Sequence, residues 1–300
     1  MSKDDRSPLV AAVILNWNNW LDTLTCVAAC KKLEWPNVCI LVVDNHSSDD
    51  SMKILLQNYP DLEIIQTGTN LGFAGGNNIG IRRALELGAD YVWLLNNDAT
   101  PAPKALAPLV HALQNDSSAA CAASKIYYQD DPQRIWFAGG AWSKGYLRLR
   151  QQGANQLDRG QFDDIRAVGS VTGCSMLIPI DKIRAVGMLD ERYFLYWEDT
   201  DWSANAQKRG YRLLFVPGSH VWHKVSATIA PRSFLQYYYY TRNGLLFCRE
   251  HDLLVLPWFL ACLAVDVVVG LAKGNKSMLR GFIKGCADFL RGRFGQQVAQ

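Results

Sequence analysis

Acidic side chains cluster in the segment Glu198-Asp199-Thr200-Asp201-Trp202. A carboxylate can take the proton from an attacking hydroxyl group if its pKa lies near the working pH. Nearby like charges raise the pKa of a carboxylate, so Glu198 and Asp201 could tune Asp199. Alternatively, the acidic residues form the charged first turn of a helix, where they interact favourably with the helix dipole. The segment therefore predicts a general base, and it also predicts the start of a helix.

A second polar set could bind a divalent metal ion. Asn96-Asn97-Asp98 follows an apolar run, and a histidine that could complete the site, His223, comes much later in the chain. The Asp98 carboxylate and the Asn96 amide oxygen are both suited to Mg²⁺ or Mn²⁺. The alternative is a polar turn and a structural histidine. We expect His220 to be a bystander.

The elements that must position these residues follow a regular pattern. Short apolar runs at residues 9–15, 38–43, 62–66 and 91–95 predict four strands, and helical patterns separate them. A glycine-rich turn precedes the helix predicted at 78–87, and a further strand and helix are predicted at 171–178 and 199–209. Consecutive strand–helix units imply an α/β fold with a mostly parallel sheet and helices on both faces. Ligands bind such sheets at the carboxyl ends of the strands.

Six motifs follow one another along the chain: Asn16-Trp17-Asn18, Val42-Val43-Asp44-Asn45, the stretch from Asn70 to Gly80, Leu94 to Asp98, Gly173-Cys174-Ser175-Met176, and Glu198 to Trp202. In type and order they resemble those of the family-2 inverting glycosyltransferases of GT-A fold, in particular bacterial rhamnosyltransferases and galactofuranosyltransferases. The resemblance extends over about residues 10–247. It implies transfer of a sugar from a nucleotide diphosphate donor with inversion at the anomeric carbon.

The resemblance also assigns roles to the two polar sets. It makes Asp199 the base, in preference to Glu198, and His223 a metal ligand. Asp98 closes the family's Asp-x-Asp motif, but Asn96 replaces the first aspartate. This replacement lowers the charge of the site, which predicts either weaker binding of Mg²⁺ or Mn²⁺ or a larger share of the ligation from the diphosphate.

Donor recognition is expected from the residues after the first two strands. These residues are Asn16, Trp17, Asn18, Asp44 and Asn45. A carboxylate such as Asp44 can accept a hydrogen bond from the imide N–H of uracil or thymine, so it would not distinguish UDP from dTDP. Alternatively, Trp17 fills the sheet edge and Asn18 caps the next helix.

A glycine-rich loop and the Asn96-Asn97 pair are also predicted to contact the donor. The loop candidates are Asn70, Gly72 and Asn77, with glycines that let the backbone approach a ligand. A tight turn that starts a helix would explain the same glycines without a ligand.

Four further residues are expected on the acceptor or phosphate side: Asp201, Trp202, Trp222 and Arg242. Arg242 follows four tyrosines and could reach a phosphate. The tyrosines themselves are expected to pack a helix onto the core.

The last third of the chain predicts a membrane-associating extension, so we divide the chain into a catalytic domain at 1–249 and a helical region at 250–300. Residues 253–272 are apolar apart from Asp266, and Pro257 interrupts them. A buried helix, or a helical hairpin that enters one leaflet, fits better than a span. Residues 276–293 form a basic amphipathic pattern that is typical of anionic membrane surfaces. The alternative is a homo-oligomer interface.

Composition limits the remaining functions. A net charge of +3 over 300 residues does not indicate a nucleic-acid partner. Eight scattered cysteines are typical of reduced, mostly buried thiols. The polar first ten residues lack the apolar run of a signal peptide, which predicts a catalytic part at the cytoplasmic face of a membrane.

The sequence thus predicts a cytoplasmic, membrane-peripheral, metal-dependent glycosyltransferase of cell-surface polysaccharide synthesis. Its expected partners are a dTDP- or UDP-sugar, with rhamnose as a candidate sugar, and a glycan or lipid-linked acceptor. Two alternatives remain. A catalytically silent glycan- or nucleotide-sugar-binding protein would explain Asn96, and a nucleotidyltransferase would share the α/β layout but not explain the segment from Glu198 to Trp202.

Overall fold

The computed structural model describes residues 6–143, 146–225 and 233–297. The first five residues of the polar N-terminal segment lie outside these ranges. The strands are β1 Val10–Asn16, β2 Val38–Asp44, β3 Glu63–Gln66, β4 Tyr91–Asn96, β5 Ala99–Pro101, β6 Ala119–Tyr128, β7 Ile135–Phe137, β8 Gly140–Ser143, β9 Tyr146–Gln151, β10 Arg166–Ala167, β11 Ser175–Pro179 and β12 Arg212–His223. The helices are α1 Trp20–Cys30, α2 Ser51–Asn58, α3 Gly72–Glu86, α4 Leu106–Asn115, α5 Ile180–Val186, α6 Glu198–Lys208, α7 Phe234–His251, the 3₁₀ turn η2 Leu253–Val255, α8 Leu256–Ala272 and α9 Lys276–Leu290.

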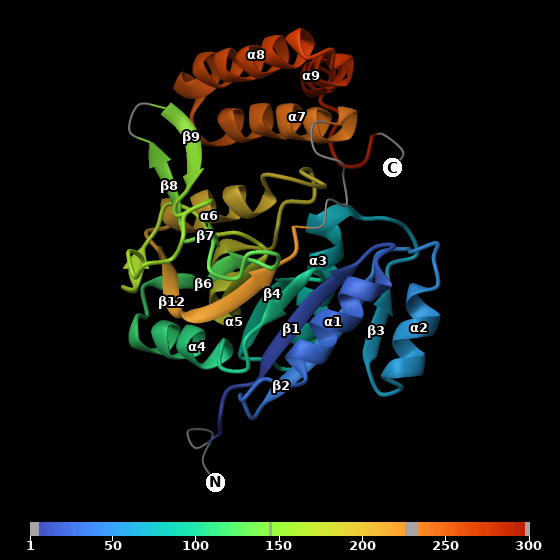
Figure 1. Cartoon of the computed structure of the whole chain (residues 1–300), viewed down its shortest axis with the longest axis vertical. Coiled ribbons are helices and arrows are strands. Elements are labelled where there is room, and N and C mark those ends of the chain that lie inside the picture. The colour runs from blue at the N-terminus through green and yellow to red at the C-terminus, as the bar shows by residue number, and fades with distance from the viewer. Residues whose placement is uncertain (1–5, 144–145, 226–232, 298–300) are drawn as a thin grey trace.

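A mixed central sheet, flanked by helices, organises the molecule (Figure 1). The strand order along its main path is β10-β12-β6-β11-β4-β1-β2-β3. The four strands β4, β1, β2 and β3 run parallel, as the sequence predicts. β11 enters antiparallel between β4 and β6, and β12 runs parallel to β6. The predicted fold class is confirmed, with antiparallel strands in its second half.

The parallel half forms because its strands are buried on both faces. Residues 10–14 of β1 and 41–43 of β2 are apolar and fully buried. Apolar runs without alternation are typical of parallel strands covered by helices on both sides. The register aligns Asn16 with Asp44, so two predicted donor-site residues end neighbouring strands at the same edge.

The glycine-rich segment is helical, so the predicted turn at this place is wrong in part. α3 begins at Gly72 rather than near residue 78. A Cβ atom at Gly76 would meet Leu15 of β1, and one at Gly80 would meet Val13 and Val43. Glycine at these positions lets α3 pack closely onto the sheet. Close helix–strand packing explains both glycines without a ligand.

The strand predicted at 171–178 is shorter than expected. β11 begins only at Ser175, because Gly173 and Cys174 form a turn in front of it. This turn lies at the edge of the sheet, beside the end of β4, where the backbone N–H of Asn96 donates to the carbonyl of Cys174 (3.1 Å).

The three C-terminal helices form a layer at the end of the molecule opposite the N-terminus (Figure 1). α9 returns along α7, and Gly281 and Gly285 allow this close packing because a Cβ atom at either position would meet the backbone of α7. α8 buries Phe259, Leu263 and Val267 on its inner side. The predicted boundary after residue 249 falls inside α7, which belongs to this helical layer. The division into two domains stays a prediction.

The outer side of α8 is apolar and exposed. The exposed fraction is 91% for Leu254, just before the helix, and 64% for Val268. By length and composition, residues Leu253–Ala272 are the one segment in the described part of the chain that could cross a membrane.

Candidate active site

The carboxyl ends of β1, β2 and β4 are joined by a chain of polar side chains. Asn16 donates to the carboxylate of Asp44 (3.0 Å) and accepts from the hydroxyl of Thr23 (2.7 Å), which in turn accepts from Asn97 (3.0 Å). Asp44 is 1% exposed, and its other oxygen accepts from the backbone of Ser47 (3.3 Å). The sequence analysis missed Thr23, because a single threonine in a helix carries no motif. Base recognition by Asp44 stays a prediction.

Trp17 and Asn18 follow β1 at the same edge. Trp17 is half-buried. Asn18 has a left-handed backbone conformation (φ 50°), and its side-chain oxygen accepts from the backbone of Ser48 (2.7 Å). Asn18 therefore ties the loop after β1 to the loop after β2. The cap of α1 is Asn19 and not Asn18.

The loop that enters α3 is built by its own polar residues. Asn45 donates to Asn70 (3.0 Å) and to the carbonyl of Gly72 (3.1 Å), and Asn70 also accepts from the backbone of Gly72 (2.9 Å). Gly72 adopts φ +71°, and a Cβ atom there would collide with Phe194. Asn77 is 2% exposed and donates to the carbonyl of Phe73 (2.9 Å). These contacts give all four predicted donor residues a structural role, and contact with a donor stays a prediction.

The fold brings Asp98 and His223 together. β5 follows Asp98 and pairs with the end of β12, so His223 lies opposite Ala99. A carboxylate oxygen of Asp98 lies 3.0 Å from Nε2 of His223, and both side chains are 7% exposed. Burial lowers the pKa of His223, but Cys174 and Asp98 outweigh it and raise this pKa to about 10. The neighbouring carboxylate of Asp98 thus favours the protonated imidazole over the neutral one.

Asp98 and His223, together with Asn96, could provide part of the ligand set of a divalent cation. The amide group of Asn96 lies 3.5 Å from Nε2 of His223, and its buried oxygen has no hydrogen-bond partner among the described residues. Together the three side chains offer a carboxylate, an amide oxygen and an imidazole, a donor set that suits Mg²⁺ or Mn²⁺. Within the described ranges, however, no group of three or more His, Cys, Asp or Glu side chains could hold a metal ion. A bound diphosphate would have to complete the set.

The predicted base lies at the start of α6. One oxygen of Asp199 accepts from the backbone of Gly173 (3.1 Å), and the other accepts from the backbone of Thr200 (2.6 Å) and from its hydroxyl (3.1 Å). Burial raises the pKa of Asp199, and these hydrogen bonds oppose the rise. The side chain remains only half-buried. Asp199 is thus fixed in position, partly accessible and a better proton acceptor than an ordinary aspartate.

Glu198 differs from its neighbour. It is 5% exposed, and one of its oxygens has no partner in the described part of the chain. Burial raises its pKa well above the usual value, and the charge of Asp199 adds to the rise. Burial therefore favours the protonated form of Glu198. A protonated carboxyl group cannot accept a proton, so Glu198 is a less suitable base than Asp199.

The Gly173-Cys174 turn lies between the candidate base, Asp199, and the candidate metal ligands, Asp98 and His223. Its first residue donates its backbone N–H to Asp199, and its second lies beside His223, while the carbonyl of Cys174 accepts from the backbone N–H of Asn96. The base and the candidate metal ligands therefore lie on either side of one dipeptide. The sequence analysis placed this motif without giving Cys174 a role.

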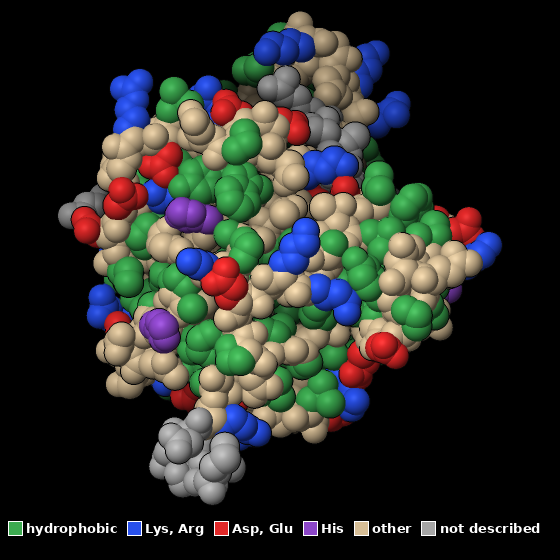
Figure 2. Space-filling view, turned by 60° about the horizontal axis from the view of Figure 1, so that its bottom comes forward, with side chains coloured by type: hydrophobic (Ala, Val, Ile, Leu, Met, Phe, Trp, Pro, Cys, Tyr) green, Lys and Arg blue, Asp and Glu red, His purple; other side chains and the backbone are tan. Residues whose placement is uncertain are grey.

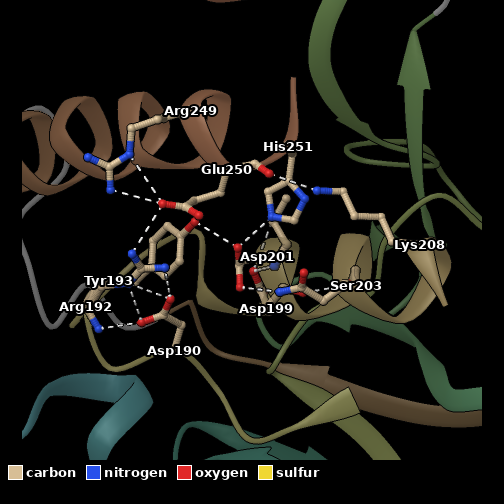
Figure 3. A network of polar contacts seen from close by, with 12 residues as sticks. Asp190, Arg192, Tyr193, Asp199, Asp201, Ser203, Lys208, Arg249, Glu250 and His251 are labelled. Atoms are coloured by element: carbon tan, nitrogen blue, oxygen red, sulfur yellow. Dashed lines mark hydrogen bonds and ion pairs between the residues drawn. The ribbon is translucent and has the colours of Figure 1, made fainter. Parts of the chain in front are cut away.

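Two predicted acceptor-side residues are structural instead. Asp201 is 4% exposed, accepts from the hydroxyl of Tyr193 (2.9 Å) and lies 2.6 Å from His251 of α7. Figure 3 shows its carboxylate pointing from α6 toward His251 at the end of α7. Trp202 is 2% exposed and donates to the carbonyl of Gly187 (2.8 Å). Both predictions are wrong because the helical periodicity of α6 turns these residues toward the protein interior.

The prediction for Arg242 is also wrong. Arg242 is fully buried, and its guanidinium donates to the carbonyls of Gly295 (2.6 Å) and Tyr193 (3.0 Å). Its donors are used inside the protein and do not face a phosphate. Trp222 stacks on Tyr127 and, as the neighbour of His223 in a strand, points to the opposite face of β12. A place of Trp222 on the acceptor side stays a prediction.

Comparison with solved structures supports the fold. The structure resembles GalNAc-T7 with UDP, GalNAc and Mn²⁺ (TM-score 0.61, 17% identity, 89% of this chain and 58% of that chain). It also resembles the mannosyltransferase PcManGT from Pyrobaculum calidifontis in complex with GDP-Man and Mn²⁺ (TM-score 0.58, 14% identity, 96% and 89%). Both are GT-A glycosyltransferases, and the chain has this fold.

Curated relatives share modest identity with the chain. The N-acetylglucosaminyl-diphospho-decaprenol L-rhamnosyltransferase of Mycobacterium tuberculosis is 25% identical over 213 residues, which cover 62% of this chain and 66% of that protein. The dTDP-rhamnosyl transferase RfbF of Shigella flexneri is 23% identical over 298 residues (95% and 97%). The galactofuranosyltransferase GlfT1 of Mycolicibacterium smegmatis is 28% identical over 166 residues (54% and 53%). The chain thus spans just under two thirds of the first relative and about half of the third.

The sequence profile described as "Glycosyl transferase family 2" matches residues 11–170. This range includes the ends of β1, β2 and β4 and the loop into α3, whereas Asp199 and His223 lie beyond it. The profile covers more than half of the chain, and the fold and relatives agree with it. The chain belongs to glycosyl transferase family 2.

Proposed function

We propose that the chain is an inverting glycosyltransferase of cell-surface polysaccharide synthesis. It would move a sugar from a dTDP- or UDP-sugar to a hydroxyl group of a glycan or lipid-linked acceptor. Rhamnose is the first donor sugar to test, because two of the relatives are rhamnosyltransferases. One of them is named for a lipid-linked diphosphate acceptor, which makes such an acceptor the first choice here.

One observation carries this proposal. Asp199 and the pair of Asp98 and His223 lie on either side of the Gly173-Cys174 turn, so a fixed carboxylate lies near a candidate diphosphate site. Inversion by single displacement needs a base and a leaving-group site that can reach one sugar from opposite faces, and a carboxylate near the candidate diphosphate site supports this reading.

In the proposed reaction, Asp199 accepts the proton of the acceptor hydroxyl as that oxygen attacks the anomeric carbon. The bond from this carbon to the diphosphate oxygen breaks, and its electron pair leaves with the nucleotide diphosphate. The raised pKa of Asp199 favours proton acceptance, and its hydrogen bonds to Gly173 and Thr200 hold the carboxylate in place.

Asp98 and His223, with the amide oxygen of Asn96, would hold Mg²⁺ or Mn²⁺. The cation would supply positive charge for the departing diphosphate. To hold it, His223 would have to be neutral, because a metal-ligating imidazole nitrogen carries no proton. Asn16, Asp44 and the loop into α3 would bind the nucleotide at the neighbouring strand ends.

We further propose that the helical layer lies on the cytoplasmic face of a membrane as a peripheral element. The outer side of α8 is apolar, and Lys273, Lys276 and Arg280 lie exposed beside it at the turn into α9. Figure 2 shows Lys and Arg side chains around this end of the molecule. An apolar face beside cations is suited to an anionic lipid surface.

Packing favours a helix that lies along the surface over one that spans the bilayer. α9 follows α8 directly and packs along its length on α7, while Gly295, beyond α9, hydrogen-bonds to Arg192 of the body and to Arg242 of α7. Both ends of α8 are therefore connected to helices on the same side, the side that faces the body of the protein. A homo-oligomer that covers the same face is the alternative.

A thermal-shift screen of dTDP- and UDP-sugars with Mn²⁺ or Mg²⁺, followed by a transfer assay with the sugar nucleotide that binds, tests the enzyme assignment. We expect stabilisation that depends on the metal, and then turnover. Binding without turnover on any glycan or lipid-linked acceptor would favour the silent binding protein. Release of pyrophosphate from a nucleoside triphosphate and a sugar phosphate would favour the nucleotidyltransferase.

A further inference from the structure

The segment just before the candidate base has an unusual backbone. Phe194, Tyr196 and Trp197 all have positive φ angles, of 63°, 67° and 79°. Bulky side chains rarely adopt this left-handed conformation, and such residues persist only where surrounding contacts hold them. Glu198 and Asp199 follow directly, so the path of this segment determines where α6 begins and where its first carboxylates lie.

Asn243 of α7 holds this segment. Its side-chain NH₂ group lies 2.6 Å from the carbonyl oxygen of Tyr193, 2.7 Å from that of Leu195 and 3.0 Å from that of Tyr196. An amide offers two hydrogens, so three carbonyls share them. Asn243 is fully buried, and its oxygen accepts from Nε of Arg242 (2.9 Å).

Arg242 supports the same segment from the other side. Its guanidinium donates to the carbonyls of Tyr193 (3.0 Å) and Arg192 (3.3 Å), and also to that of Gly295 (2.6 Å). The charge lies over the rings of Tyr238 (5.4 Å) and Tyr239 (5.0 Å), which stabilise a buried cation. The two neighbouring residues of α7 thus bind carbonyls of residues 192, 193, 195 and 196.

The held segment also contacts the donor side. The carbonyl of Phe194 accepts from the backbone N–H of Phe73 (2.6 Å) at the start of α3, and its side chain fills the space beside Gly72. Through these contacts, one strained segment joins the start of α3, the start of α6 and the helical layer. Figure 3 shows a further link nearby, from Asp201 of α6 to His251 at the end of α7.

We propose that Arg242 and Asn243 are positioning residues for catalysis. They hold residues 193–197 in the strained conformation that sets Asp199 against Gly173 and sets the start of α3, without touching the substrate. The inference rests on the proposed role of Asp199 as base. It gives the Arg-Asn pair a role within the protein instead of contact with a phosphate.

The first test measures hydrogen exchange in the full chain and needs no activity. Asn243→Leu fills a similar volume but removes the donors. Met278→Ala is the control, because Met278 is 4% exposed in the same helical layer but packs against Gly270 of α8. We expect Asn243→Leu to speed exchange at residues 72–77 and 193–201 by about tenfold, and Met278→Ala to leave both segments unchanged.

The second test separates positioning from general stability. In a folded Asn243→Leu variant, kcat should fall about 100-fold, as misplacement of a catalytic group by about 1 Å predicts. The KM for the donor and the thermal shift with UDP or dTDP and Mn²⁺ should change far less. Met278→Ala should lower the melting temperature without lowering kcat. If the parent chain transfers no sugar, the proposed function fails, while the exchange experiment still tests how the pair holds the segment.

Arg242→Lys covers the case in which Asn243→Leu does not fold, because lysine keeps the charge and can still donate to a carbonyl. We expect a smaller fall in kcat and faster exchange in the same two segments. Unchanged exchange at 193–201 with unchanged kcat, in either folded variant, would overturn the proposal.

Discussion

The candidate active site at the carboxyl edge of the sheet buries charged side chains, whereas the outer side of α8 exposes apolar ones. At the edge, Asp98, Glu198 and His223 are at most 9% exposed, although charged groups are usually solvated. On α8, Val265 and Val268 are 62% and 64% exposed, although clustered apolar side chains are usually covered. Each departure costs free energy in the isolated chain. The two departures fit the two proposed partners, a charged donor at the edge of the sheet and a lipid surface at the helical layer.

Removal of the base should have the largest effect. Asp199→Asn keeps the shape of the side chain but cannot accept the proton, so kcat should fall by about two to four orders of magnitude while donor binding changes little. Steady-state kinetics with the identified donor measures this. Asp181→Asn, at an exposed carboxylate at the start of α5, is the control and should behave as the parent chain does. Near-normal turnover in a folded Asp199→Asn variant would remove Asp199 from this role.

Loss of the candidate metal ligands should have the next largest effect. Asp98→Ala or His223→Ala should weaken metal-dependent binding of UDP or dTDP by about 100-fold, the upper end of losses seen when metal sites lose supporting groups. Isothermal titration in the presence of Mn²⁺ measures this. His220→Ala is the matched control on the same strand. Sugar transfer that survives exhaustive chelation would contradict the metal site. Asp98 and His223 would then form a buried pair without a metal.

The apolar side of α8 should determine lipid binding. Val265→Asp combined with Val268→Asp should weaken binding to vesicles with anionic lipids by about 30-fold, since about 2 kcal/mol of apolar transfer is lost. Sedimentation with vesicles at low salt measures the change. Ile165→Asp is the control, because Ile165 is 58% exposed but lies outside the helical layer. The parent chain could instead fail to bind vesicles and form a dimer. If these substitutions break that dimer, the outer side of α8 is an oligomer interface.

The smallest effect concerns the stability cost of the buried charge at Glu198. Its raised pKa means that the folded chain binds more protons than the unfolded chain above the usual glutamate pKa, so the free energy of unfolding falls as pH rises through that range. Glu198→Gln cannot ionise and should raise the melting temperature by about 2 °C at pH 8, with little gain at pH 5. Calorimetry at the two pH values measures this. An equal change at both would show that the carboxylate is not the source of the cost.

The sequence by itself determined the parallel half of the fold and the identity of its edge residues. Apolar runs and helical periodicity are local signals, and each spans fewer than about 20 residues. They placed Asn16 and Asp44 at strand ends, and parallel strands then bring such ends to one edge. The order of motifs gave the family and the choice of Asp199 over Glu198, which the burial of Glu198 now supports.

The tertiary structure alone decided which polar side chains face the candidate site. Asn96 and His223 are 127 residues apart, and they meet only because β5 pairs with the end of β12. Asp201 and Arg242 were predicted to lie at the site from their charge and motif, yet α6 and α7 turn them into the protein. The direction of a side chain depends on which remote element packs against its own. A local pattern does not contain that information, so charge and spacing identified candidates that packing then divided into site and scaffold.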